Sequence, residues 1–402
     1  MEIINKEKSP FYPGQPVPVD FFIGRIDQIN RIKRAIKQVE LGKPQAIFLT
    51  GEYGIGKSSL AGFMRFLAER DNEILGIYVL LGGATNLDDL VSRTVESALQ
   101  GRSYKPTNTE KVRDFLSKYI GKQEFFGVTL NFEALRSDAP NISRGFLPFI
   151  RGLFHRVNED GVKGIMLVFD EINGISKNPQ FAHFIKTLID ENALNEPSLP
   201  LLLMLCGVKE RMRDMIQHHE PVERIFDIVD ITPMSDSEMR DFFNYSFRSV
   251  ETEIKPDAMN ILCHYSAGFP KIMHIIGDAA FWIDKDKIID VVDAAEAVLL
   301  AADEVGKKFF DQQVLQALRS RDYKAILSKL ADSQFDLAFN KKDIQRGISD
   351  IQNKKLNNFL QRMKKLKVLK QGEERGEYIF NSRLVRLYLR LAYSKPLKIE
   401  PQ

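Results

Sequence analysis

The stretch GEYGIGKS, residues 51–58, matches the pattern G-x-x-x-x-G-K-[ST]. An apolar run, QAIFLT, precedes it at residues 45–50, and residues 57–70 after it have a helical pattern. A glycine-rich loop between a strand and the start of a helix lets successive backbone amides approach a phosphate group closely. The stretch therefore predicts a P-loop that binds nucleotide phosphates. The alternative is a glycine-rich turn between strand and helix that binds no ligand.

Each part of this loop has an expected role toward a nucleotide. Backbone amides from Gly54 to Ser59 should point at phosphate oxygens, aided by the start of the helix. Lys57 should reach the β- and γ-phosphates, and the Ser58 hydroxyl should ligate Mg²⁺. We therefore expect ATP and Mg²⁺ as cofactors. The expected nucleotide contacts in the loop are Gly51, Glu52, Tyr53, Gly54, Ile55, Gly56, Lys57, Ser58 and Ser59.

A second candidate element is GIMLVFDE, residues 164–171, in which an apolar run leads into two carboxylates. Asp170 should hold Mg²⁺ through a water molecule, and Glu171 should polarise the attacking water as a general base. The alternative is a strand that simply ends in two solvated carboxylates. Together with the P-loop upstream, the pair predicts an ATPase that converts ATP to ADP and phosphate.

The arrangement of apolar runs predicts the fold class of this region. Five such runs alternate with helical patterns, at residues 45–50, 74–81, 164–169, 199–205 and 227–231. Continuously apolar strands that alternate with helices indicate a parallel sheet covered on both faces. We therefore predict an α/β core of three layers. Residues 125–132, FFGVTLNF, are expected to form an additional β element on this core.

The pattern changes to helices from Ser235 onward. Ser235 and Glu238 have the spacing of a capping box, which predicts the start of a helix there. The helical block continues to about residue 302. The last region combines helices with a final β-hairpin, whose turn is formed by residues 373–376.

Charge is concentrated in this last region. The whole chain has a formal net charge of +3, whereas residues 341–370 hold ten basic and two acidic side chains, a local balance of +8. Five apolar residues of this stretch have helical spacing and should face the hydrophobic core: Leu356, Phe359, Leu360, Met363 and Leu366. A basic helix followed by a hairpin suits phosphate contacts with double-stranded DNA over residues 341–376. The alternatives are a solvated charged face and a surface that docks a protein.

Composition restricts the class of protein. A chain of 402 residues should form two or three domains, and 44% hydrophobic with 28% charged residues is typical of a globular protein. No apolar run is long enough to span a membrane, and the first residues lack the apolar segment of a secretion signal. Cys206 and Cys263 form no disulfide framework or zinc spacing. We expect a cytoplasmic location.

The order of these elements resembles the AAA+ and signalling branches of the P-loop ATPases. It is most similar to the archaeal and bacterial ATPases related to origin-recognition proteins. PVPVDFFIGR, residues 16–25, resembles their adenine-covering segment, which implies that Phe22 and Ile23 contact the base. YSAGFPKIMHIIGDAA, residues 265–280, resembles their lid helix, which implies that Lys271 is the sensor-2 residue. Residues 339–347, 356–370 and 376–390 resemble their winged helix.

Three positions depart from that resemblance. The fourth strand should end in a polar sensor-1 residue, but here it ends Leu205-Cys206-Gly207, and this predicts slow hydrolysis. Lys271 replaces the commoner arginine, which loses bidentate geometry. Arg224 stands where the family usually presents its arginine finger. The alternative for Arg224 is a surface ion pair, and further candidates for the finger are Arg211 and Arg213.

We therefore expect a nucleotide-binding core at residues 1–233, a helical lid at 234–305 and a winged-helix domain at 306–402. The expected function is an ATP-controlled switch in which the winged helix binds or releases DNA. The alternative is a signalling or defence-type ATPase whose winged helix docks a protein or inhibits the chain itself. A homo-oligomer is expected if Arg224 completes a neighbouring site.

Overall fold

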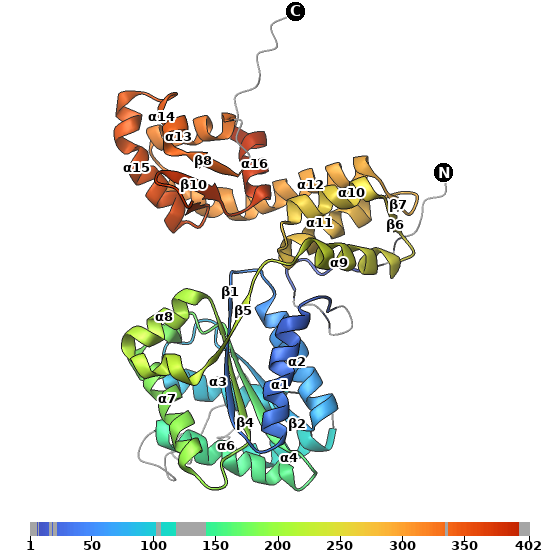
Figure 1. The fold of residues 1–402 in the computed structure, drawn as a ribbon, viewed down its shortest axis with the longest axis vertical. Coiled ribbons are helices and arrows are strands. Elements are labelled where there is room, and N and C mark those ends of the chain that lie inside the picture. Colours follow the sequence, from blue (N-terminus) through green and yellow to red (C-terminus); the bar gives the residue numbers. More distant parts are fainter. Residues whose placement is uncertain are drawn as a thin grey trace, which may run out of the picture. The chain divides into compact units, whose positions relative to one another are not determined.

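The computed structural model describes residues 6, 8–15, 18, 22–101, 106–117, 142–333 and 337–393. The chain forms two compact units, one from Pro16–Thr232 and one from Met1–Gln15 together with Pro233–Gln402 (Figure 1). The β element expected at residues 125–132 lies outside the described residues. Within the described part of the chain, no helix is both long and apolar enough to cross a membrane.

The first unit is built on a five-stranded parallel sheet with the order β2-β3-β4-β1-β5. Its strands are β1 (Gln45–Gly51), β2 (Ile74–Leu80), β3 (Gly164–Asp170), β4 (Leu201–Gly207) and β5 (Asp227–Ile231). The five predicted strands are all present. Because these strands are parallel, the ends of β1, β3 and β4 meet at one edge of the sheet, where the P-loop begins and Asp170 lies.

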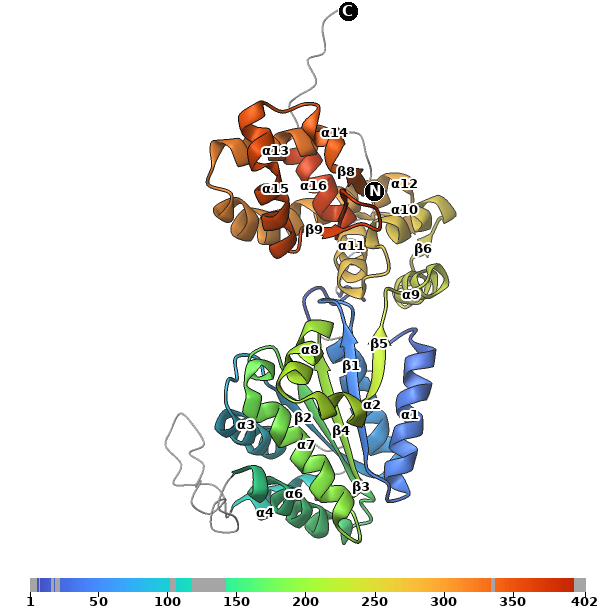
Figure 2. The same ribbon diagram turned by 60° about the vertical axis from the view of Figure 1, so that its left-hand side comes forward.

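Helices cover both faces of this sheet (Figure 2). On one face lie α1 (Ile26–Glu40) and α2 (Lys57–Asn72). On the other face lie α3 (Leu87–Gln100), α4 (Pro106–Ser117), α6 (Ile142–Asn158), α7 (Pro179–Leu194) and α8 (Lys209–His218). Apolar side chains of the sheet alternate between these layers, since strand residues point to opposite faces in turn. The predicted three-layer α/β core is confirmed.

The second unit begins with four lid helices. They are α9 (Asp236–Arg248), α10 (Pro256–Ser266), α11 (Pro270–Ile283) and α12 (Val291–Val305). The predicted capping box is present, because the Ser235 side chain accepts from the Glu238 amide and the Glu238 carboxylate accepts from the Ser235 amide. A short pair of parallel strands, β6 (Glu253–Ile254) and β7 (Ile288–Ile289), links the connection between α9 and α10 to the connection between α11 and α12.

The beginning of the chain packs on this lid. We call the described residues 6 and 8–15 the arm. Phe11 is 4% exposed, and its ring lies 5.0 Å from the Phe247 ring at an angle of 65°. The Lys6 ammonium pairs with the Asp284 carboxylate at 2.7 Å. On sequence grounds residues 1–15 are expected with the core; the described residues among them, 6 and 8–15, lie with the lid instead, because Phe11 buries its ring there.

The rest of the second unit has the elements of a winged helix. A π-helical segment, Gly306–Leu315, follows α12. The other helices are α13 (Arg321–Asp332), α14 (Lys341–Gln345), α15 (Asp350–Lys365) and α16 (Arg383–Tyr393). The antiparallel strands β8 (Ala338–Asn340), β10 (Glu377–Phe380) and β9 (Leu369–Gln371) form a sheet in that order. As predicted, α15 buries Leu356, Phe359, Leu360 and Met363; Leu366 caps its end and is only partly buried.

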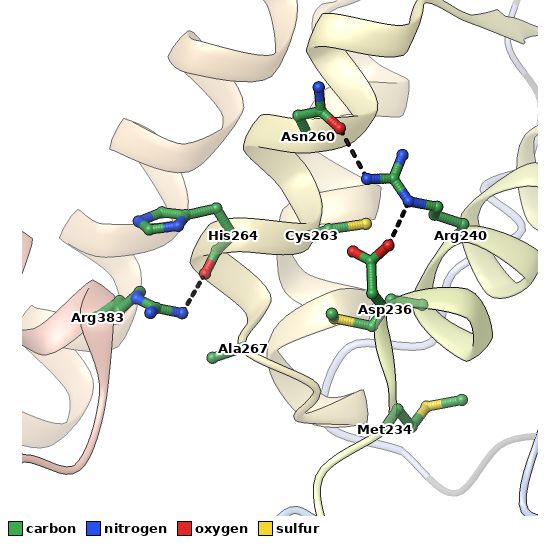
Figure 3. A pocket seen from close by; sticks show the side chains of 9 residues that line it. Met234, Asp236, Arg240, Asn260, Cys263, His264, Ala267 and Arg383 are labelled. Atoms are coloured by element: carbon green, nitrogen blue, oxygen red, sulfur yellow. Dashed lines mark hydrogen bonds and ion pairs between the residues drawn. The ribbon is translucent and has the colours of Figure 1, made fainter.

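Helix α16 docks on the lid through polar contacts. Arg383, at its start, donates to the His264 carbonyl at 2.9 Å. A pocket of about 400 Å³ lies beside this contact (Figure 3). Its charged groups engage one another, since Arg240 pairs with Asp236 at 2.6 Å and donates to Asn260 at 2.8 Å. We therefore attribute these groups to the docking of α16 and α9 on α10.

Candidate nucleotide-binding site

The loop between β1 and α2 is shaped to hold an anion. Gly54 has a φ of 76° and Gly56 a φ of 97°, a left-handed backbone that glycine adopts at little cost. The residue before α2 is Gly56, which has no side chain to cap the first amides, and the first turn contains no acidic residue. The amides at a helix start lack partners within the helix and carry a partial positive charge. The loop therefore fits the phosphates of a nucleotide.

Lys57 brings its charge to the same loop. Its ammonium donates to the Gly51 carbonyl at 3.0 Å and to the Glu52 carbonyl at 2.8 Å. It also lies 5.6 Å from the centre of the Tyr53 ring. The loop thus folds around a lysine cation, which adds to the attraction for an anion.

Asp170 lies at the end of β3, is only 3% exposed, and accepts two hydrogen bonds. One comes from the Glu171 amide at 2.8 Å and the other from the Tyr78 hydroxyl at 2.6 Å. The same hydroxyl is 3.3 Å from the Ser58 carbonyl oxygen. Tyr78 therefore donates to Asp170 and lies beside Ser58, the two residues expected to hold Mg²⁺. An oxygen-rich pair of this kind suits that ion.

Sequence reasoning missed Tyr78. Burial and then the neighbouring Asp170 carboxylate raise the pKa of its phenol far above the ordinary value, so the hydroxyl stays protonated and donates. A signal was present, because Tyr78 carries the one hydroxyl in the otherwise apolar run ILGIYVLL, residues 74–81. Aromatic residues are common in strands, so this signal alone does not distinguish a site residue from a core residue.

Glu171 adopts an unusual backbone conformation. Its φ is 58°, which non-glycine residues seldom adopt. Its carboxylate lies against Gly82, where an added Cβ atom would stand 2.6 Å from Glu171 Oε2. Arg93 donates to the Gly82 carbonyl at 2.7 Å and to the Leu80 carbonyl at 3.0 Å, which holds this loop in place. Gly82 thus leaves the space that the Glu171 carboxylate occupies.

The neighbouring strand β4 ends without a polar sensor-1 side chain. Cys206 stands at that position and is fully buried. Burial, followed by the nearby Asp170 carboxylate, raises the pKa of its thiol well above the usual value, so the thiol stays neutral. Lys209, the next polar residue, pairs with Asp230 at 2.7 Å.

The segment before α1 lies against the P-loop. Phe22 stacks on Phe63 of α2, with ring centres 4.6 Å apart and planes 8° from parallel. Arg25 is 4% exposed and donates to the Ile55 carbonyl at 3.1 Å and to the Thr232 carbonyl. Ile23 is partly buried. The segment therefore packs on the loop, while the contact of Phe22 and Ile23 with adenine stays a prediction.

Two other predicted site residues are not brought to this loop within the core unit. Lys271 lies in the first turn of α11, in the second unit, so its sensor role stays a prediction. Arg224 is exposed on the short 3-10 helix Glu220–Ile225 and makes no ion pair with a described residue. Of the further finger candidates, Arg211 pairs with Asp214 at 2.6 Å, and Arg213 is exposed.

The candidate DNA surface is basic along α15 but acidic at the hairpin turn. Exposed basic side chains along and after α15 are Lys354, Lys355, Arg362, Lys365, Lys367 and Lys370. Lys355 pairs with Asp322 of α13, so part of its charge is neutralised within the domain. The turn between β9 and β10 contains Glu373 and Glu374 beside Arg375. Phosphate contacts would therefore come from the helix more than from the turn.

Comparison with known proteins identifies the fold. A Walker-type ATPase of Pyrococcus abyssi matches with a TM-score of 0.55 at 18% identity, covering 92% of this chain and 96% of that one. The ORC2 protein of Aeropyrum pernix, in ADPNP–ADP complexes, matches with a TM-score of 0.59 at 12% identity, covering 95% and 94%. The chain has the fold of AAA+ ATPases.

The likeness extends over the core, lid and winged-helix regions of this AAA+ fold, because more than nine-tenths of the chain is covered. At these identities it is a likeness of fold. No protein-family model and no curated protein matches the sequence. The chemistry of the site is therefore argued from its own residues.

Proposed function

We propose that this chain is a switch ATPase that binds ATP with Mg²⁺ and hydrolyses it slowly. The observation that carries the proposal is the P-loop, whose helix start follows Gly56 and contains no acidic residue, next to the Ser58–Tyr78–Asp170 group. The nucleotide complexes named for the Aeropyrum pernix ORC2 protein support ATP as the ligand class.

The proposed roles follow the chemistry of each side chain. Lys57 and the amides of the loop bind the phosphates, while Ser58 and Asp170 would hold the metal. Mg²⁺, when bound, would neutralise phosphate charge and polarise phosphoryl oxygens. Glu171 takes the proton from the attacking water. Slow turnover follows because the neutral Cys206 thiol cannot orient that water as a stronger hydrogen-bonding side chain would.

Nucleotide binding is tested with Lys57→Ala and a fluorescent ATP analogue. Loss of the ammonium should weaken binding at least about tenfold, because a charge-assisted contact to phosphate contributes about 1.5–3 kcal/mol. Lys43→Ala is the matched control, since Lys43 is exposed at the opposite end of β1. Equal affinity of the Lys57 variant and the wild type would mean that the site is misassigned.

We further propose that the winged helix couples nucleotide state to double-stranded DNA through residues 341–376. The exposed basic side chains of α15 support this proposal. Each phosphate neutralised should lower the logarithm of affinity by about 0.9 per tenfold rise in salt. Little base specificity is expected, because these side chains are mainly lysines, which are point charges and lack the bidentate fork of arginine.

Charge reversal distinguishes DNA binding from protein docking. Arg362→Glu with Lys365→Glu should weaken DNA binding at low salt and reduce its salt dependence, leaving ATP binding unchanged. The control is the same charge reversal at Lys33 and Lys43, which are both exposed on the surface of the first unit. If folded, nucleotide-competent protein retains no DNA at low salt, the second candidate function takes precedence: a signalling or defence-type switch whose winged helix docks a protein. The acidic turn at Glu373 and Glu374 favours that candidate.

A further inference from the structure

We propose that Tyr78 is a positioning residue that orients the Asp170 carboxylate toward the Mg²⁺ site before the metal binds. This inference rests on the proposed function, since it concerns the same site. It adds a residue from β2, whereas the sequence motifs confine the site to the P-loop and the end of β3.

Sheet register places Tyr78 where it can act. Tyr78 pairs with Val168 across β2 and β3, and Asp170 follows two residues later on the same face of β3. Two strand residues span about 6.6 Å, which is close to the reach of a tyrosine side chain. The hydroxyl therefore reaches the Asp170 carboxylate while the ring stays packed along the strand, and the two oxygen atoms lie 2.6 Å apart.

The second contact of Tyr78 places its hydroxyl beside the first turn of α2 as well as at the end of β3. Its hydroxyl is also 3.3 Å from the Ser58 carbonyl in the first turn of α2. Ser58 and Asp170 come from different elements, and the hydroxyl, which has one proton, donates to one acceptor at a time; the shorter distance assigns this proton to Asp170. Groups that hold metal ligands from behind set the orientation of those ligands, and losing one commonly lowers metal affinity.

The surroundings of Asp170 leave this task to Tyr78. Within the described residues, its other hydrogen-bond donor is the backbone amide of Glu171 at 2.8 Å. On the β4 side stands the Cys206 thiol, which is a weak donor. Tyr78 is thus the side chain that donates to Asp170 in the described part of the chain.

The experiment separates metal binding from nucleotide binding. Tyr78→Phe removes the hydroxyl and keeps the ring. Binding of a fluorescent ATP analogue is measured in EDTA and then across a Mg²⁺ titration, and Mn²⁺ binding is followed directly by electron paramagnetic resonance. We expect unchanged affinity in EDTA and about a tenfold or greater rise in the metal concentration needed for half-saturation. Tyr323→Phe, a partly exposed tyrosine of α13, should leave both values unchanged.

A second variant tests whether Tyr78 acts through Asp170. In an Asp170→Asn background, adding Tyr78→Phe should shift the metal requirement much less than it does in the wild type, because the carboxylate it positions is gone. Equal shifts in both backgrounds would overturn the inference, as would an unchanged metal requirement in Tyr78→Phe. A wild-type protein that binds nucleotide without responding to the metal would overturn it too. A wild-type protein that binds no nucleotide would instead overturn the proposed function, and with it this inference.

Discussion

His274 is a buried imidazole at the contact between the arm and the lid. Its Nδ1 atom accepts a hydrogen bond from the Tyr12 amide at 3.2 Å, so that nitrogen carries no proton. Its ring meets the Phe242 ring edge-on, 4.9 Å between centres. Burial lowers the pKa of His274 to about 4. The neutral form is therefore part of the folded lid.

The stability of the second unit should consequently depend on pH. An unfolded histidine takes up a proton near pH 6.5, whereas folded His274 does so only near pH 4. The stability it contributes is fully present above about pH 6.5 and is lost as the pH falls toward 4, by up to about 1.4 kcal/mol per pH unit. Urea unfolding of wild type and His274→Gln at pH 7.5 and 5.0 measures this. The free energy of unfolding should fall less on acidification in the variant than in the wild type. Equal losses in the two proteins would contradict the role given to His274.

Glu171 offers a second test at the scale of one residue. Glu171→Gln keeps the volume of the side chain but removes the base. We expect ATP binding within about twofold of wild type and phosphate release slowed about 100-fold or more. Glu223→Gln, on the exposed 3-10 helix, is the control. Unchanged turnover in Glu171→Gln would assign the base to another residue.

At the scale of elements, the arm and helix α11 fit each other through a glycine. A Cβ atom added at Gly277 would overlap the Phe11 ring. An alanine elsewhere in a helix is normally more stable than glycine by about 0.5–1 kcal/mol. At Gly277 this gain should be outweighed, because the arm would have to leave its place.

We therefore predict that Gly277→Ala lowers the melting temperature and exposes the arm to proteases. Gly62→Ala in α2 is the matched control, since no atom lies within 4 Å of its added Cβ, and it should be neutral or stabilising. Phe11→Ala should lower the free energy of unfolding by at most about 3–5 kcal/mol, the usual cost of removing a buried phenylalanine side chain. In that background Gly277→Ala should no longer destabilise. Additive losses would show that the overlap is not the cause.

At the scale of the whole molecule, the arginine finger requires a second copy of the chain. Arg224 could complete a neighbour's site only in a head-to-tail assembly with a heterologous interface. Mixing Arg224→Ala protein with Glu171→Gln protein tests this. If subunits exchange, about a quarter of the interfaces in an equal mixture would pair an intact Arg224 with an intact Glu171. ATPase activity should then exceed that of either protein alone; a mixture no more active than its parts would contradict the shared site.

Features that depend on neighbours in the sequence could be predicted from it. The loop at residues 51–58, the capping box of Ser235 and Glu238, and the buried stripe of α15 all arise from hydrogen bonds or side-chain periods within a few residues. The parallel sheet was also predictable, because its strands are short apolar runs separated by helices. These patterns determined the fold class and the residues of the proposed phosphate and metal site.

Only the tertiary structure decided which distant segments meet. Tyr78 reaches Asp170, 92 positions later, because β2 and β3 pair in one particular register. Phe11 packs beside Gly277 on the lid, although sequence grounds place it with the core. Arg25 joins the P-loop to Thr232 at the end of the core unit. The spacing of apolar residues within one element predicts which face of that element is buried. The element that packs against this face depends on how separate elements come together, and no single stretch of the sequence contains that information.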